Sequence, residues 1–436
     1  MIPEPRPDPL ERFKMNMVAS PSRLAGQVKM PASKSHTIRA LLLAALADGE
    51  SRISNPLDSA DTRACVGAVR ALGAPVETGP EWRVGGVEGK IRPTGETIDV
   101  ANSGTTLYLA LGAASLGREW VEFTGDDQIR KRSAGPLLNA LREMGAAVES
   151  YENSGCAPIR VRGPLRGGQV SVRCPTSQYL SSLLLASPLA ERETLIHVLE
   201  LNERPYVDMT LGWLNKLGIQ YSHEDMERFH ITGGQRYDAF REKICGDFSS
   251  ATFFLCAAAI TNSSLALDDL DMNNAQGDKA VVPMLRRMGA RIDIKAHRIH
   301  VRGAELKGAE FDLNATPDAL PAMAVTGCFA EGETRLVNVP QARIKETDRI
   351  RVMCEVLRAL GGDAEELPDG LIVRGRGLRG GNASGYGDHR VVMALAVAGL
   401  AAEHPVTVST AEAVNVTFPD FVGLMQEAGG DVRVEP

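Results

Sequence analysis

The segment Lys-Glu-x-x-Arg, formed by Lys345, Glu346 and Arg349, places two cations and a carboxylate within five residues. Apolar residues recur at helical spacing after Thr347, so the sequence predicts an amphipathic helix that begins near this residue. Arg349 then falls in the first turn, where the helix dipole disfavours a cation by roughly 0.3 to 1 kcal/mol. An isolated copy of this pattern is explained more simply by a solvated helix start with a local ion pair. Further copies elsewhere in the chain favour an anion-binding site.

The segment PASKSHTIRA repeats the arrangement near the N-terminus, with Lys34, Ser35 and Arg39 at a predicted helix start. Hydroxyl and N–H donors combined with two cations are typical of phosphate recognition. The competing interpretation is a serine that caps the helix, beside a lysine whose stem lies along the surface.

Two further segments place small or cationic residues before helices. Asn102 and Gly104 form a turn that lets a ligand approach the backbone closely, although a plain turn explains this segment alone. Arg132 comes directly before Ser133, which we expect to cap the following helix. A cation again lies at the positive end of a helix.

Three other helix starts complete the set. Thr176, Ser177 and Gln178 offer neutral donors for a phosphate or a hydroxyl, or simple capping. Asp318 is either a cap or, if it is desolvated, a general base, and Arg390 begins the last apolar helix.

The joint pattern favours a substrate site. Five cations from separate parts of the chain all lie against the preference of the helix dipole, namely Lys34, Arg132, Lys345, Arg349 and Arg390. Their mutual repulsion would cost stability without a polyanionic ligand, so we expect them to converge in one cleft. Asp318 and Glu346 then suggest base and acid roles on a small, multiply charged substrate.

An internal repeat sets the architecture. Segments such as AVRALGAPVE, ALREMGAAVE and MLRRMGARID each read as a helix end, a glycine cap and an alternating strand. The capping glycines recur at intervals of about 70 residues: Gly73, Gly145, Gly218, Gly289, Gly361 and Gly429. A second helix in each unit is apolar on all sides and must be buried. The sequence predicts an α/β protein of six equivalent units whose buried helices present their N-termini to one anion-binding region.

Three units per lobe is the natural grouping, with a hinge near residues 244–247. Residues 33–244 are expected to form the N-terminal lobe. The first strand crosses between lobes in this interpretation, so residues 1–32 join residues 245–436 in the C-terminal lobe.

Composition limits the remaining possibilities. The 436 residues are 44% hydrophobic and 24% charged, which is typical of a soluble protein of two or three domains. The formal charge of −7 disfavours nucleic acid as a partner. We expect no membrane span, a cytoplasmic location, reduced cysteines among the seven present, and no metal site.

The motifs PASKSHTIRALLLAALA, NSGTT, SQYL, RPYVDMTL, RIKETDRI, GDHRVVMALA and TFPDF occur in an order that resembles the 5-enolpyruvylshikimate-3-phosphate synthase family of enolpyruvyl transferases. The resemblance runs from about Leu24 to the C-terminus. It implies a two-lobed fold of six βαβαββ units, three per lobe. It also implies transfer of the enolpyruvyl group of phosphoenolpyruvate to the 5-hydroxyl of shikimate 3-phosphate through a tetrahedral intermediate, by a cofactor-free monomer.

The resemblance assigns the site residues. Shikimate 3-phosphate, bound mainly by the N-terminal lobe, would contact Lys34, Ser35, Arg39, Thr176, Ser177, Gln178, Tyr206, Asp318 and Lys345. Phosphoenolpyruvate, placed on the side of the C-terminal lobe, would contact Lys34, Asn102, Gly104, Arg132, Gln178, Arg349 and Arg390. Asp318 would be the base, Glu346 the proton donor to the methylene carbon, and Lys34 would touch both substrates.

Four residues depart from the family pattern. Val416 stands where many members have a lysine that contacts phosphoenolpyruvate, and Glu203 stands where a serine or threonine usually helps to bind the acceptor phosphate. A carboxylate there repels phosphate unless Arg204 neutralises it. Gln341 replaces an asparagine and Tyr108 an arginine. Two alternatives therefore remain, the same transfer to a different acceptor and a non-catalytic anion-binding paralogue. The cysteine expected of a UDP-N-acetylglucosamine-dependent relative is absent from TGDDQIRKRS.

Overall fold

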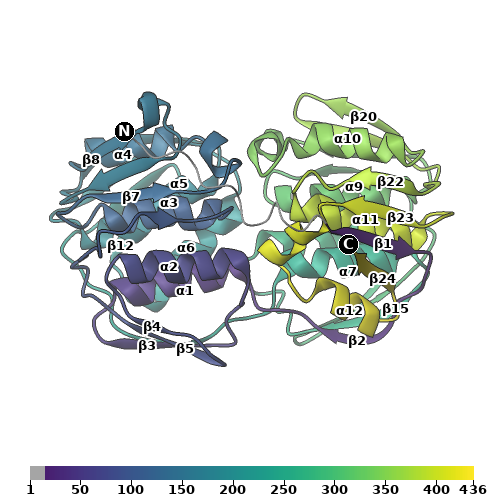
Figure 1. Ribbon diagram of the computed structural model, residues 1–436, viewed down its shortest axis with the longest axis horizontal. Coiled ribbons are helices and arrows are strands. Elements are labelled where there is room, and N and C mark those ends of the chain that lie inside the picture. The colour runs from purple at the N-terminus through teal and green to yellow at the C-terminus, as the bar shows by residue number, and fades with distance from the viewer. Residues whose placement is uncertain (1–14) are drawn as a thin grey trace. The chain divides into compact units, whose positions relative to one another are not determined.

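The computed structural model describes residues 15–436, which divide into two compact units. The N-terminal unit comprises residues 31–247 and 273–277. The C-terminal unit comprises residues 15–30, 248–272 and 278–436. Each contains three four-stranded sheets and its own hydrophobic core. Figure 1 shows both units with the elements labelled.

The three sheets of the N-terminal unit share one strand order. In the first, β14 (Arg241–Lys243) is followed by β3 (Glu50–Ser54), β5 (Glu81–Gly85) and β4 (Val76–Glu77). The second has β6 (Ile98–Asp99), β7 (Val121–Thr124), β9 (Ile159–Arg162) and β8 (Ala147–Ser150). The third has β10 (Gly168–Cys174), β11 (Thr194–Leu201), β13 (Arg228–Ile231) and β12 (Tyr221–Glu224). The first pair in each sheet is parallel and the other pairs are antiparallel.

The C-terminal unit repeats this pattern. Its sheets are β2 (Ala25–Lys29), β15 (Ser264–Asp268), β17 (Arg298–Arg302) and β16 (Arg291–Lys295); then β18 (Glu310–Asp312), β19 (Glu333–Val337), β21 (Gly370–Arg374) and β20 (Asp363–Leu367). The last contains β22 (Gly381–Ser384), β23 (Val406–Ser409), β1 (Asn16–Ser20) and β24 (Asp431–Glu435). Strand β1 is thus the third strand in the sheet of the sixth repeat and pairs with β23 and β24. The two ends of the described chain therefore meet in one sheet.

Each repeat contains one buried helix and one amphipathic helix, as predicted. The buried helices are α1 (Lys34–Leu46), α3 (Gly104–Ala114), α5 (Ser177–Ala186), α7 (Phe248–Ile260), α9 (Leu320–Cys328) and α11 (His389–Ala401). The amphipathic helices are α2 (Ala60–Ala71), α4 (Gly135–Glu143), α6 (Arg204–Lys216), α8 (Val281–Met288), α10 (Arg349–Ala359) and α12 (Phe421–Glu427). All eleven residues of α3 are buried. The six predicted capping glycines have φ between 70° and 114°, the left-handed conformation expected of helix C-caps.

Two predicted helix starts were wrong by one or two residues. Helix α10 begins at Arg349 because Asp348 is its N-cap and accepts a hydrogen bond from the Arg351 amide at 3.1 Å. The N-cap of α4 is Ala134 rather than Ser133, although Ser133 Oγ still accepts from the Gly135 amide at 3.1 Å.

Residues 31–32 and 245–247, which were expected in the C-terminal lobe, belong to the N-terminal unit. The unit boundary also differs from the sequence-based one at residues 273–277. This short segment belongs to the N-terminal unit, because Gln276 Nε2 donates to the Gly246 carbonyl at 2.8 Å and Asn274 Oδ1 lies 3.2 Å from His36 Nε2. The contact between His36 and Asn274 joins residues 238 positions apart and leaves no periodic signal in the sequence.

Candidate functional site

Lys34 stands at the first turn of α1 in the N-terminal unit. Its Nζ lies 3.0 Å from the Asp61 carboxylate at the start of α2, and the Asp61 side chain is only 5% exposed. The N-cap of α1 is Ser33, whose hydroxyl accepts from the amide of His36. The carboxylate of Asp61, which the sequence analysis missed, therefore orients Lys34. Its only sequence signal was an acidic residue in the first turn of a helix.

Arg39 is buried one turn further along α1 and joins this helix to α6 and, through a 3.4 Å contact with Ser181 Oγ, to α5. Its guanidinium donates to Thr210 Oγ1 at 2.9 Å and to the carbonyls of Ser35 and Tyr206, both at 3.1 Å. Burial, as the largest influence, lowers the pKa of Arg39 to about 10. Arg39 thus fixes the carbonyls of two other candidate residues, and Tyr206 is half-buried at the start of α6.

Gly104 and Arg132 lie together at the start of α3. A Cβ at position 104 would lie 2.9 Å from Arg132 Nη1, so only glycine leaves the guanidinium in this place. Tyr108 and Tyr179 both donate to the Ser133 carbonyl, at 3.3 and 2.5 Å, and pack edge to face. Tyr108 therefore helps to hold the loop that carries Arg132.

Asn102 lies just before α3 and is held by its neighbours. Its amide nitrogen donates to Asp126 Oδ2 at 2.5 Å and to Gln128 Oε1 at 2.9 Å. These contacts leave the side-chain oxygen, rather than the nitrogen, as the group that Asn102 can offer to a ligand.

The start of α5 gathers Thr176, Ser177 and Gln178. Thr176 and Ser177 are almost fully buried and contact the carboxylate of Glu203. The Oε1 atom of Gln178 is shielded from solvent and accepts no hydrogen bond from the residues that the structure describes. It is an acceptor suited to a ligand hydroxyl.

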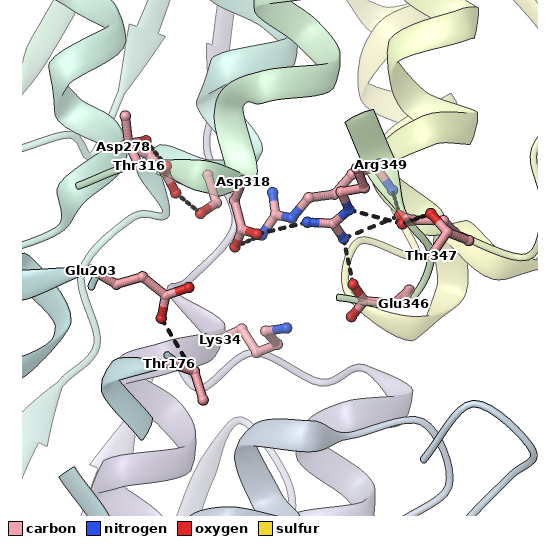
Figure 2. A network of polar contacts seen from close by, with 12 residues as sticks. Lys34, Thr176, Glu203, Asp278, Thr316, Asp318, Glu346, Thr347 and Arg349 are labelled. Carbon is pink, nitrogen blue, oxygen red and sulfur yellow. Dashed lines mark hydrogen bonds and ion pairs between the residues drawn. The ribbon is translucent and has the colours of Figure 1, made fainter. Parts of the chain in front are cut away.

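Arg349 is the centre of the C-terminal unit's cluster, and its side chain is 1% exposed. Its guanidinium contacts Asp388 Oδ2 at 2.8 Å, Asp318 Oδ1 at 2.7 Å and Glu346 Oε2 at 2.5 Å. Figure 2 shows the contacts with Asp318 and Glu346. The Asp388 carboxylate also caps α11 and accepts from Thr347 Oγ1 at 3.0 Å. Burial disfavours the charged guanidinium, but Asp388, Glu346 and Asp318 together raise the pKa of Arg349 above its usual range.

Asp318 bridges two arginines. Arg390 Nη2 lies 2.9 Å from its second oxygen, while Arg349 holds the first. Burial opposes ionisation of Asp318, but Arg390, Lys345 and Arg349 outweigh it and lower the pKa of this carboxyl below its usual range. Asp318 is therefore an ionised carboxylate whose basicity increases when a ligand takes over its arginines.

Asp278 is a second buried carboxylate that the sequence analysis missed. It lies in the short 3₁₀ helix Gly277–Ala280, directly before α8. It accepts hydrogen bonds from Ser249 Oγ and from Thr316 Oγ1, which lies two residues before Asp318 (Figure 2). Burial and the nearby Asp318 raise the pKa of Asp278. The pKa of Asp318 is thus lowered while that of Asp278 is raised. Carboxyl groups with pKa values shifted in opposite directions are frequent in acid–base sites.

One premise of the sequence analysis was wrong. It treated the cations as uncompensated, but Asp318, Glu346 and Asp388 neutralise the two arginines of this cluster, and Asp61 neutralises Lys34. A bound anion must therefore compete with the chain's own carboxylates. The two halves of the candidate site lie in different units, and convergence of all five cations stays a prediction.

The residues that depart from the family pattern also have definite surroundings. Gln341 is 3% exposed, and its Nε2 donates to the Asn314 carbonyl at 2.9 Å. Val416 is half-buried at the end of a short 3₁₀ helix (Ala411–Val416).

His36 follows Lys34 by two residues in α1, and its surroundings indicate that the stability of the fold depends on pH. The indole Nε1 of Trp213 donates to His36 Nδ1 at 3.1 Å, so the neutral ring carries its proton on Nε2. Burial, followed by the charges of Arg39 and Lys216, lowers the pKa of His36 to about 4 against a partial opposing effect of Asn274. The unfolded chain then binds this proton more tightly than the folded protein does.

We expect the free energy of unfolding to fall by about 2 kcal/mol between pH 7.5 and pH 5 on account of this histidine. Urea unfolding at both pH values measures the change. His36→Gln removes the titrating group and should abolish most of the difference. An equal pH dependence in wild type and variant would contradict the assignment.

The described residues contain no group of three or more His, Cys, Asp or Glu side chains placed to hold a metal ion. Between residues 15 and 436, no helix is both long and apolar enough to cross a membrane.

Comparison with known proteins gives a consistent result. The family model for EPSP synthase (3-phosphoshikimate 1-carboxyvinyltransferase) matches residues 18–425. The 3-phosphoshikimate 1-carboxyvinyltransferase of Acetivibrio thermocellus is 53% identical over 94% of this chain and 97% of its own, and that of Ruminiclostridium cellulolyticum is 50% identical over 95% and 98%. The solved EPSP synthase of Acinetobacter baumannii, 28% identical, superposes with a TM-score of 0.82 over 97% of this chain and 100% of its own. On these matches and the repeated fold, the chain belongs to the EPSP synthase family.

Proposed function

We propose that this protein transfers the enolpyruvyl group of phosphoenolpyruvate to the 5-hydroxyl of shikimate 3-phosphate and releases phosphate. The observation that carries the proposal is the buried cluster of Asp318, Glu346, Arg349 and Arg390. It combines a carboxylate base, a second carboxyl group and two arginines within direct contact. A protein that only binds anions has no need of the two carboxyl groups.

Phosphoenolpyruvate carries a phosphate and a carboxylate, which suit bidentate arginines. In the proposal, Arg349 and Arg390 turn from Asp318 and Glu346 towards this substrate. Arg132 and the backbone at Gly104 contribute from the N-terminal unit, with Asn102, Gln178 and Lys34 beside them.

Shikimate 3-phosphate is assigned to the donors at the starts of α1, α5 and α6. They are Lys34, Ser35, Arg39, Thr176, Ser177, Gln178 and Tyr206, with Lys345 and Asp318 completing the site from the C-terminal unit. The shielded oxygen of Gln178 supports this assignment because the acceptor's hydroxyls can donate to it.

The reaction follows from these positions. Asp318 takes the proton of the 5-hydroxyl as its oxygen bonds to C2 of phosphoenolpyruvate, and Glu346 gives a proton to the methylene carbon. The tetrahedral intermediate then loses a proton from the methyl group and expels phosphate, so the double bond is restored. Cations near the leaving oxygens stabilise the charge that develops there.

A phosphate-release assay tests the proposal. Purified protein with both substrates should release inorganic phosphate, and omission of either substrate should abolish the release. Release only with another acceptor would favour the first alternative, and binding of both substrates without turnover would favour a non-catalytic paralogue. We further propose a monomer in the cytoplasm, which light scattering and fractionation of the source cells can test.

Gly104→Ala should raise the KM for phosphoenolpyruvate about tenfold or more, because the new Cβ displaces Arg132 Nη1. The displaced atom is the end of a flexible side chain, so the melting temperature should change little. Steady-state kinetics and thermal unfolding give both values. Gly67→Ala in α2, where a Cβ meets nothing within 4 Å, is the matched control. Equal KM values for the two variants would contradict the proposed role.

A further inference from the structure

Glu203 is a buried carboxylate directly before α6. The residue is 1% exposed and adopts a left-handed backbone conformation with φ of 60°. Non-glycine residues in this region are uncommon and recur at functional sites, where the surrounding structure holds them. Arg204, which the sequence analysis considered as a neutralising partner, is exposed to solvent.

The Glu203 side chain reaches across to the start of α5 (Figure 2). Its Oε2 accepts from Ser177 Oγ at 2.9 Å, Thr176 Oγ1 at 3.1 Å and the Ser177 amide at 3.2 Å. Two hydroxyls and one backbone N–H thus converge on one carboxylate oxygen. All three residues belong to the N-terminal unit, so their arrangement is defined within it.

This arrangement has the chemistry of a phosphate site that an internal anion already fills. Hydroxyl and amide donors at a helix N-terminus are the usual partners of a phosphate oxygen. Thr176 and Ser177 are also among the donors assigned above to shikimate 3-phosphate, and donors of this kind at a helix start suit its phosphate group. Two anions cannot share these donors, because they repel each other and each donor has one proton to give.

We propose that Glu203 is an internal competitor for the acceptor's phosphate, whose carboxylate must leave Thr176 and Ser177 before the acceptor binds. Glu203 then weakens binding of the acceptor without touching the reacting atoms. The inference rests on the proposed function for the identity of the acceptor. The competition itself concerns any phosphate group at the start of α5.

Kinetics of two variants test the competition. Asparagine tolerates the left-handed backbone and is one methylene shorter, so Glu203→Asn should vacate the donors. We expect the KM for shikimate 3-phosphate to fall about tenfold or more, with kcat and the KM for phosphoenolpyruvate nearly unchanged. Glu203→Gln keeps the length and removes the charge, and should give an intermediate KM. An unchanged or higher KM in Glu203→Asn, with a wild-type melting temperature, would overturn the proposal.

Inorganic phosphate provides a test that does not need turnover. Thermal unfolding with increasing phosphate should show half-maximal stabilisation of Glu203→Asn at a concentration at least tenfold lower than for wild type. Ser177→Ala in the Glu203→Asn background should remove this gain, because it deletes the vacated hydroxyl. Equal phosphate dependence of wild type and Glu203→Asn would refute the competition.

The two tests separate the two proposals. If phosphate stabilises Glu203→Asn as expected but shikimate 3-phosphate supports no turnover in either protein, the competition holds and the assigned acceptor is wrong. If wild type turns over shikimate 3-phosphate with the same KM as Glu203→Asn, the function holds and the competition is wrong.

Discussion

Arg349→Ala is expected to lower the free energy of unfolding by about 3 to 5 kcal/mol, because it leaves buried carboxylates without their cation. Asp388 loses a two-point contact with the guanidinium, at 2.8 and 3.1 Å, and its side chain is fully buried. Asp318 and Glu346 each lose an ion pair in the same change. Urea unfolding at pH 7 measures the loss.

The same variant should lose at least about a hundredfold in kcat/KM, since it lacks the arginine that the proposed function assigns to phosphoenolpyruvate in the transition state. Arg349→Lys restores one charge but not the planar fork, and should recover only part of the stability. Arg351→Ala is the matched control, because Arg351 lies on the same helix and is exposed. If Arg349→Ala unfolds like Arg351→Ala, the three carboxylates do not depend on this guanidinium.

Local patterns were sufficient to predict the repeated architecture. Gly289, for example, ends a short amphipathic helix with φ of 114°, and this conformation is readily accessible only to glycine. Helix α3 could be placed in the core because it opens with small and polar residues, continues as an apolar stretch and has no charged face to meet water. Such signals lie within one turn or one strand of the residue concerned.

The partners of the charged residues could not be predicted in this way. Arg349 and Asp388 are separated by 39 residues, and Lys34 and Asp61 by 27. Each pair forms because two helix starts from different elements are brought together by packing of the core. Sequence spacing showed that cations gather at helix starts, but it gave no sign that the chain supplies its own anions there.

The contacts of Glu203 could not be predicted from the sequence either. The residue type identified a departure from the family pattern and suggested repulsion of phosphate. The left-handed backbone that directs this side chain to Ser177 is a property of the folded loop. Only the structure shows that the carboxylate occupies the donors themselves.

Asp318→Asn is expected to lower kcat by about 10² to 10⁴-fold, the usual contribution of a positioned general base. The KM for phosphoenolpyruvate should stay the same or fall. In the proposed mechanism, phosphoenolpyruvate has to take Arg349 and Arg390 from the Asp318 carboxylate of the wild type, and an uncharged amide competes for them less strongly. A fall in kcat without a rise in KM therefore distinguishes a base from a residue that only binds substrate.

Stability as a function of pH gives an independent check on Asp318. Its pKa is lowered in the folded protein, so its ion pairs stabilise the fold above the ordinary carboxyl pKa of 3.8, and this contribution is lost as the pH falls below that value. Wild type should accordingly be more stable than Asp318→Asn at pH 7, and the difference should shrink below pH 4. Glu310→Gln removes an exposed carboxylate that pairs with Arg335, and is the control for a general loss of charge. If the difference in free energy of unfolding between wild type and Asp318→Asn does not change with pH, Asp318 is not the ionised partner of the two arginines. The base would then have to be another residue of the cluster.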